Sequence, residues 1–385
     1  MTGTLVLMGS GETSPTMVEV HRGVISALGP QPRAILLDTP YAFQENARDI
    51  SARAQQYFAR SVGLEVEVGG VIATADWVFS GPGSPTYALD RWLGGSDAGD
   101  LRARVRARQG VTVLASAAAC TAGAATVPVY EIYKVGAEPY WREGLDLLRP
   151  LGLEAVVIPH YDNAEGGTHD TRFCYLGERR LSRMERELPA GTGILGVDEH
   201  TAVVIDLVAE QARVVGRGVL TVRAGGTLAV LPAGATASLG ELRGLLRGEA
   251  TAPEVKPVEA VARELTLEET VRACEESFAT ADGPSAATKI ILDLEGEIAR
   301  WAADMEEDAG GSEEARDALR RMIATLGADS GRSMAAQIVP PLLALRERLR
   351  QERAFALADA VRQALGEGGV LVEDTADGPR WSLLG

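Results

Sequence analysis

The chain has 385 residues, 46% of them apolar and 24% charged, a composition that excludes wholesale disorder and predicts two or three globular domains. The net charge of −16 argues against a general nucleic-acid binder, because phosphate binding depends on basic surface. No stretch reaches the roughly 20 apolar residues of a membrane helix, no signal peptide is recognisable, and three scattered cysteines exclude a disulfide scaffold. We expect a cytoplasmic protein with no membrane partner.

Short apolar runs alternate with polar, helix-like stretches through the first 235 residues. Most runs are rich in Val, Ile and Leu and do not alternate in polarity, which is typical of strands buried on both faces of a parallel sheet. Closer runs between Gly193 and Leu231 predict hairpin-like strands that extend one edge. The pattern predicts an α/β fold, a parallel sheet flanked by helices. The expected strands are Thr4–Met8, Ala34–Leu37, Trp77–Phe79, Val111–Ala115 and Ala155–Ile158, with crossover helices such as Gln44–Ser61 and Ala98–Arg108.

Two prolines and a glycine within residues 246–257 predict a linker. We therefore expect one domain at 1–245 and a second at 258–385. Beyond the linker the apolar residues follow helical spacing, and an Asp-Gly turn near the end predicts a small hairpin. The second domain is thus expected to be mostly helical, with helices at 267–278, 290–301, 313–326 and 341–365.

Turn-forming residues follow three of the expected strands. In an open parallel sheet, ligands bind outside the carboxyl ends of the strands, where small residues let the backbone approach them. The third of these turns is Ser116–Ala119. Gly9-Ser10-Gly11 is not a dinucleotide fingerprint, because Ser14 stands where the third glycine belongs, and no cofactor is predicted. The candidate ligand-binding residues of the first two turns are Gly9, Ser10, Gly11, Glu12, Gly81, Gly83 and Ser84.

The densest set of reactive side chains lies between His160 and Tyr175, directly after an expected strand. This position is the ligand edge of the sheet, so we expect His160 to face a pocket. The histidines and carboxylates lack HxH or HExxH spacing, and no metal site is predicted. Cys174 is expected to be a packed thiol. Candidate catalytic or ligand-binding residues here are His160, Asp162, Asn163, Glu165, His169, Asp170 and Arg172.

The order of these segments resembles the dipeptidase E and cyanophycinase family of serine peptidases, whose fold is like that of class I glutamine amidotransferases. The resemblance covers about residues 1–235 and includes the segment Gly196-Val197-Asp198-Glu199-His200-Thr201-Ala202. It implies a serine nucleophile in a G-x-S-A-G-A elbow, which is a sharp turn from strand to helix. It also implies a histidine base after the next long strand, a position that His160 matches.

The elbow of this chain departs from that pattern in either of two registers. The register Ala115–Cys120 puts Ala117 at the nucleophile position, whereas Ala119–Ala124 puts Thr121 there. The first is favoured because it sets the turn at the end of a five-residue strand. An alanine cannot attack a carbonyl, so the serine nucleophile is expected to be replaced. Ser116 or Cys120 would then serve only if the backbone were rearranged.

A triad acid, if one persists, is expected at Glu131, between the elbow and His160, with Asp198 and Glu199 as rivals. We expect the His160-centred loop to bind or transform a small amino-acid-like or peptide-like ligand. The alternative is a non-catalytic pseudo-peptidase that acts as a regulatory or tRNA-associated binding protein.

Residues 265–385 resemble the C-terminal region of cysteinyl-tRNA synthetases. The resemblance rests on an R-x-x-x-R segment from Arg346, an A-x-x-D-x-x-R segment from Ala356 and an L-x-E-D-T-x-x-G-x-x-W segment from Leu371. It implies tRNA binding, but residues 251–385 hold 26 acidic against 15 basic side chains, a net −11. Because this charge disfavours tRNA, we expect a module for oligomerisation or scaffolding, and a homo-oligomer. The opposing feature is a basic patch formed by Arg346, Arg348, Arg350 and Arg353.

Overall fold

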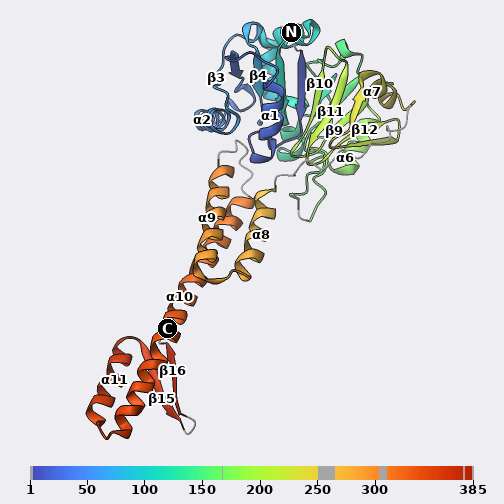
Figure 1. Cartoon of the computed structure of the whole chain (residues 1–385). Helices are drawn as coiled ribbons and strands as arrows, with labels where there is room; N and C mark the ends of the chain where they lie inside the picture. The colour runs from blue at the N-terminus through green and yellow to red at the C-terminus, as the bar shows by residue number, and fades with distance from the viewer. Residues whose placement is uncertain (1–2, 167, 250–264, 303–309, 376–377, 384–385) are drawn as a thin grey trace. The chain divides into compact units, whose positions relative to one another are not determined.

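The computed structural model describes residues 3–166, 168–249, 265–302, 310–375 and 378–383. The chain divides into two compact units, an α/β unit followed by a mostly helical one (Figure 1). The predicted linker at 246–257 lies mostly outside the described residues, and the predicted domain boundary stays a prediction. No helix in the described part of the chain is both long and apolar enough to cross a membrane.

An eight-stranded mixed sheet forms the centre of the first unit (Figure 1). Five of its strands pair in parallel, and the other three continue the sheet in antiparallel fashion. This arrangement confirms the predicted α/β fold. Of the strands predicted to extend one edge, those at 201–206 and 211–216 do so, whereas those at 193–197 and 227–232 belong to a second sheet. In sheet order the strands are β14 (Thr236–Ser238), β11 (Gln211–Gly216), β10 (Thr201–Asp206), β1 (Thr4–Met8), β5 (Val111–Ala115), β4 (Trp77–Ser80), β2 (Ala34–Leu36) and β3 (Glu67–Val68).

The strand Ala155–Ile158 (β8) belongs to a second sheet instead of the main one. It pairs in parallel with β9 (Gly193–Val197), and β12 (Val219–Ala224) and β13 (Thr227–Pro232) complete the order β13-β12-β9-β8. The sequence predicted one sheet because it could not show which strands pair. On its other side, β8 meets the segment that follows the elbow, where the Ala124 N–H donates to the Ala155 carbonyl at 2.8 Å.

Helices flank the strands of the first unit, with α1 and α2 beside the main sheet and α6 and α7 beside the second (Figure 1). The predicted crossover at 44–61 is observed as α2 and the helical turn that continues it, and the one at 98–108 as α4. The helices are α1 (Val18–Ile25), α2 (Ala47–Tyr57), α3 (Pro85–Gly94), α4 (Asp97–Ala107), α5 (Ser116–Cys120), α6 (Gly177–Glu185) and α7 (Leu239–Leu246), and shorter turns include η3 (Phe58–Val62) and η5 (Tyr130–Lys134).

The main sheet is buried on both faces. Leu5 and Leu7 of β1 pack into one apolar core, while Val6 and Met8 pack into another. Neighbouring residues of a strand point to opposite faces, so an uninterrupted apolar run is what two covered faces require. The carboxyl ends of β1, β4 and β5 therefore lie together at one edge of a rigid layer.

In its described residues, the second unit contains four helices and a terminal hairpin. The helix α10 is continuous through Pro340 and Pro341, so the two helices predicted at 313–326 and 341–365 are wrong in extent. The helix α10 ends at Gln351, and Arg353, in the connection to the next helix, adopts a left-handed φ of 61°. The elements are α8 (Leu267–Ala279), α9 (Gly283–Trp301), α10 (Gly310–Gln351), α11 (Phe355–Glu367), β15 (Val370–Thr375) and β16 (Gly378–Leu383).

Part of the predicted basic patch on α10 is engaged in ion pairs. Arg346 is 2% exposed and donates to both carboxylate oxygens of Asp374, at 2.7 and 2.8 Å. Arg350 donates to the same carboxylate at 3.3 Å. The Arg346 hydrogen bond and the nearby arginine charges lower the pKa of Asp374 to about 2. These arginines therefore hold the hairpin against the helix. Oligomerisation through this unit stays a prediction, with tRNA binding as the disfavoured alternative.

His21 of α1 is completely buried, away from the polar loop. Its Nε2 donates to the Glu12 carbonyl at 2.6 Å, and its ring meets Phe58 edge-on with 5.1 Å between ring centroids. Burial lowers the pKa of His21 to about 4, although the backbone hydrogen bond opposes the shift. The folded protein therefore holds this ring neutral.

Acidification should destabilise the first unit through His21. Between pH 6.5 and 5 the unfolded chain takes up a proton that the folded state excludes, which removes about 2 kcal/mol of stability. The glutamine of His21→Gln keeps a donor for the carbonyl but does not titrate. Between pH 7 and pH 5 we therefore expect its free energy of unfolding to fall by about 2 kcal/mol less than that of the unmodified chain. Urea unfolding followed by circular dichroism at both pH values measures this. Equal losses in the two proteins would contradict the prediction.

Candidate active site

Ser116 is the first residue after β5 and the first residue of α5. Its φ of 46° is left-handed, a conformation that costs a non-glycine residue about 1–2 kcal/mol and is concentrated at functional sites. A strand, a strained residue and a helix in immediate succession form the geometry of a nucleophile elbow. The sequence placed Ala117 at the nucleophile position, whereas the structure puts the left-handed turn residue one position earlier, at Ser116.

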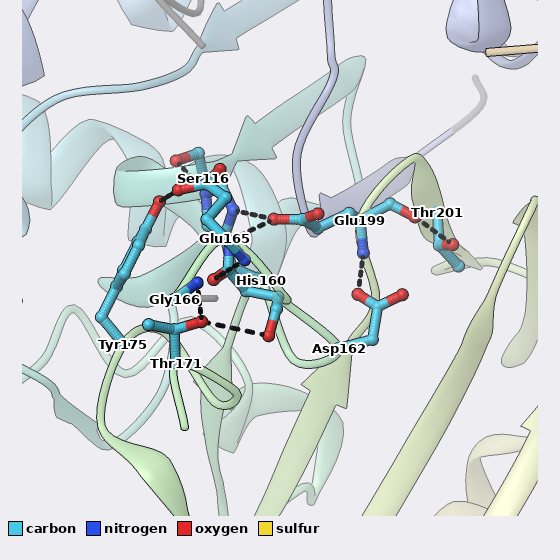
Figure 2. Close-up of polar contacts among 10 residues, drawn as sticks. Ser116, His160, Asp162, Glu165, Gly166, Thr171, Tyr175, Glu199 and Thr201 are labelled. Atoms are coloured by element: carbon cyan, nitrogen blue, oxygen red, sulfur yellow. Dashed lines mark hydrogen bonds and ion pairs between the residues drawn. The ribbon is translucent and has the colours of Figure 1, made fainter. Parts of the chain in front are cut away.

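His160 lies between Ser116 and a carboxylate (Figure 2). Its Nε2 is 3.0 Å from the Ser116 Oγ, and its Nδ1 is 2.8 Å from the Glu199 Oε1. A carboxylate can only accept, so Nδ1 donates and Nε2 is left to accept from the serine hydroxyl. The three side chains thus form the sequence of hydroxyl, imidazole and carboxylate that activates a serine.

Glu199 sits in the turn between β9 and β10, and the loop after His160 holds it at two points. The Asp162 carboxylate accepts from the Glu199 backbone N–H at 2.8 Å, and Asn163 Nδ2 donates to the Glu199 Oε1 at 3.0 Å. Burial alone would raise the pKa of Glu199, but the hydrogen bonds from His160 and Asn163 and the nearby histidine charges outweigh it. The net shift is downward, so the carboxyl is ionised at neutral pH.

The acid expected at Glu131 does not lie against His160. Glu131 belongs to η5, and its Oε2 accepts from the Thr86 hydroxyl at 3.1 Å. The rival Asp198 points the other way in the turn and accepts from the Val219 N–H at 2.9 Å. Burial and the charge of Asp162 raise the pKa of Asp198 to about 6. Glu199, the other rival, is the residue that the structure places at the imidazole.

A cavity of about 450 Å³ opens onto Ser116 and His160. Pockets of this size hold small ligands. Tyr175 closes one side, with its ring centroid 6.1 Å from that of His160 and its hydroxyl donating to the Glu165 Oε2 at 2.8 Å. Sequence reasoning did not identify most residues of the cavity wall. Tyr130 and Tyr133, which flank Glu131, could have indicated an aromatic wall. Side chains lining the cavity include Tyr41, Gln44, Tyr130, Tyr133, Lys134, Glu165 and Tyr175.

The polar loop folds back onto its own beginning. Phe173, Cys174 and Tyr175 are three consecutive left-handed residues, with φ of 63°, 54° and 63°. The Cys174 N–H donates to the His160 carbonyl at 3.1 Å, and the Phe173 N–H donates to the Tyr161 carbonyl at 3.0 Å. Three left-handed residues in a row are unfavourable. These hydrogen bonds and the packing around them must therefore stabilise the backbone conformation in which the loop folds back.

Several predicted site residues have structural roles instead. The Cys120 thiol is buried against the Val127 carbonyl, and burial raises its pKa to about 12, so it is no thiolate nucleophile. Asp170 and Arg172 pair with each other at 2.8 Å, and the Asp170 carboxylate also accepts from the Glu178 N–H at 2.9 Å. The exposed His169 stacks on Tyr133, 6.4 Å between centroids. Tyr133 lines the cavity, whereas Cys120, His169, Asp170 and Arg172 are not among its lining residues.

The first two turns support the site more than they line it. Gly83 is the candidate among them that lines the cavity. Ser84 caps α3 by accepting from the Tyr87 N–H at 3.2 Å, and Glu12 is completely buried beside Gly81. Ser10 is also buried. A side chain on Gly11, whose φ is +64°, would overlap the ring of His200. The His200 Nδ1 forms a hydrogen bond with the Thr16 hydroxyl at 2.9 Å.

Gly9 lies against the turn that bears Glu199. A Cβ at this position would overlap the carbonyl oxygen of Asp198, and the Gly9 N–H donates to the Thr201 carbonyl at 2.9 Å. Within the described residues, no group of three or more His, Cys, Asp or Glu side chains is arranged to hold a metal ion.

Gly9→Ala should push the Glu199 turn away and destabilise the first unit by about 1–3 kcal/mol, as overpacking does. Gly23→Ala is the matched control, because Gly23 lies inside α1 with open space at its Cβ position. There the same change should stabilise by about 0.5–1 kcal/mol. Urea unfolding of both variants measures the difference, and a Gly9→Ala protein as stable as the control would refute the contact.

No family model matches the chain. A crystal structure of a peptidase from an acI-B1 Actinobacterium is 21% identical, with a TM-score of 0.48, and covers 62% of this chain and 97% of that one. A putative peptidase E protein from Listeria monocytogenes EGD-e is 15% identical, with a TM-score of 0.36, and covers 60% and 99%.

A cysteine–tRNA ligase of Nocardioides sp. (strain ATCC BAA-499 / JS614) is 52% identical over 46 residues, 12% of this chain and 10% of that protein. The chain therefore spans about a tenth of the length of this curated relative. The chain is similar to peptidases and, over a short segment, to a cysteine–tRNA ligase. Both resemblances predicted from the sequence are therefore confirmed.

Proposed function

We propose that the first unit is a serine hydrolase that cleaves an amide-type bond in a small amino-acid-like or peptide-like ligand. Ser116 is the nucleophile, His160 the general base and Glu199 the triad acid. The observation that carries the proposal is the placement of the Ser116 Oγ and the Glu199 Oε1 on the two opposite nitrogens of one imidazole, at 3.0 and 2.8 Å.

The chemistry follows from this order of side chains. The Ser116 Oγ attacks the substrate carbonyl carbon while His160 Nε2 takes its proton, and the ionised Glu199 stabilises the resulting imidazolium. His160 then gives the proton to the departing amine, which leaves an acyl ester on the serine. Water, deprotonated by the same nitrogen, attacks the ester carbonyl, and His160 returns this proton to the Ser116 oxygen as the acid leaves. The cavity of about 450 Å³ favours a ligand of a few residues over a folded protein.

A fluorophosphonate probe tests the nucleophile. We expect the unmodified chain to be labelled stoichiometrically and Ser116→Ala to lose labelling by at least about 100-fold, because the alanine has no oxygen to attack phosphorus. Ser26→Ala is the control, since Ser26 is an exposed residue after α1 whose hydroxyl donates to the Gly23 carbonyl of the same helix. Intact-protein mass spectrometry reads the adduct. An unlabelled wild-type chain would support the non-catalytic binding protein instead.

A matched pair of isosteric changes tests the acid. Glu199→Gln should slow fluorophosphonate labelling on the order of 10³-fold, because an amide cannot stabilise the imidazolium. Glu131→Gln should change the labelling rate less than about threefold, because Glu131 bonds Thr86 and not His160. Rate constants are measured at pH 7.5 on proteins of equal stability. A larger loss of labelling rate in Glu131→Gln than in Glu199→Gln would instead assign the role of triad acid to Glu131.

A further inference from the structure

Asn163 is an almost fully buried amide, 1% exposed, three residues after His160. Its Nδ2 donates at 3.0 Å to the Glu199 Oε1, the same oxygen that accepts from His160 Nδ1 at 2.8 Å. Its Oδ1 accepts from the Glu165 N–H at 3.3 Å. With a backbone N–H on one side and a carboxylate on the other, the amide has one satisfactory orientation.

We propose that Asn163 is a positioning residue that fixes the carboxylate of Glu199 for the serine chemistry, an inference that rests on the proposed function. The last torsion of a glutamate side chain is broad, so one hydrogen bond from an imidazole leaves the carboxylate free to turn. Two donors on the same oxygen remove that freedom. The imidazole then keeps its proton on Nδ1 and presents Nε2 to Ser116.

A neutral amide also suits the charges around this carboxylate. Asp162 and Asp198 lie close enough to Glu199 to act on it electrostatically, and His200 acts in the opposite sense. From the polar loop, Asp162 acts electrostatically on His160, and the Tyr175 ring lies beside the imidazole with its hydroxyl bound to Glu165. The Cys174 thiol and Tyr175 lie close enough to Glu199 to interact with it electrostatically. An aspartate at 163 would add another carboxylate and would offer no donor, although it has the same shape. The amide therefore supplies a hydrogen bond without further negative charge.

Asn163 also connects the acid to the cavity wall. Glu165, whose N–H the amide oxygen accepts, lines the cavity and binds the Tyr175 hydroxyl. The Thr171 hydroxyl, in the returning part of the loop, donates to the Asn163 backbone carbonyl at 3.4 Å. One side chain thus ties the orientation of the triad acid to the loop that encloses the ligand.

The experiment compares Asn163→Asp and Asn163→Ala with Asn46→Asp, which changes the other asparagine of the chain in the same way. Two readouts are taken from pH 5 to 9: the rate of fluorophosphonate labelling, and the NMR titration of the His160 ring in protein with labelled histidine. The chain has four histidines, so the His160 signal can be assigned by its loss in His160→Gln.

We expect Asn163→Asp to move both midpoints upward by about one pH unit, because the added carboxylate holds the imidazole proton. Asn163→Ala should lower the plateau labelling rate about tenfold, and Asn46→Asp should match the unmodified chain. A merely structural role would lower the labelled fraction at every pH without moving the midpoints. That result, or midpoints equal to those of Asn46→Asp, would overturn the inference.

Failure of the proposed function gives a different result. A wild-type chain that is not labelled, with a His160 midpoint that still moves in Asn163→Asp, rejects the hydrolase and keeps the positioning contact. A labelled chain whose midpoint does not move rejects the contact and keeps the hydrolase.

Discussion

The site depends on a contact between two backbones, made where Gly9 at the end of β1 lies against the carbonyls of Val197 and Asp198. Ser116 follows β5 in the main sheet, whereas His160 and Glu199 follow β8 and β9 in the second sheet. The serine therefore meets its base across two sheets, and their relative position must hold to within a few tenths of an ångström for hydrogen bonds. Only a residue without a side chain allows the strand end and the turn to come this close.

Asp162, Asp198 and Glu199 lie close to one another near the His160 imidazole, and their surroundings shift their pKa values in different directions. Burial raises the pKa of Asp162, and burial with the charge of Asp162 raises that of Asp198 to about 6. For Glu199 the hydrogen bonds of His160 and Asn163 outweigh burial and lower the pKa. Ionisation is thus favoured at the carboxylate that faces the base. Environments that separate the pKa values of neighbouring acids are a property of catalytic sites, and here a buried amide contributes to the separation.

Uninterrupted apolar runs located the strands from the sequence, because burial on both faces leaves a local signal. Pairing leaves none, so the transfer of β8 to a second sheet could not be predicted. At the elbow, β5 was placed correctly at Val111–Ala115, which by itself indicates Ser116 as the turn residue. The register chosen for the family pattern moved the expectation to Ala117. Asp198 and Glu199 are adjacent in one turn, and only the three-dimensional path of the backbone decides that the second faces His160.

The second unit shows why a motif and a net charge can suggest different partners. Arg346 and Arg350 of the R-x-x-x-R segment, and Arg362 of the next segment, all lie within 4 Å of the Asp374 carboxylate, which belongs to the E-D-T segment. The three stretches that resemble the synthetase region therefore meet in one ion-pair cluster that joins α10 and α11 to the hairpin. At Arg346 the motif therefore serves the fold, since a guanidinium that is 2% exposed has no surface left for a phosphate.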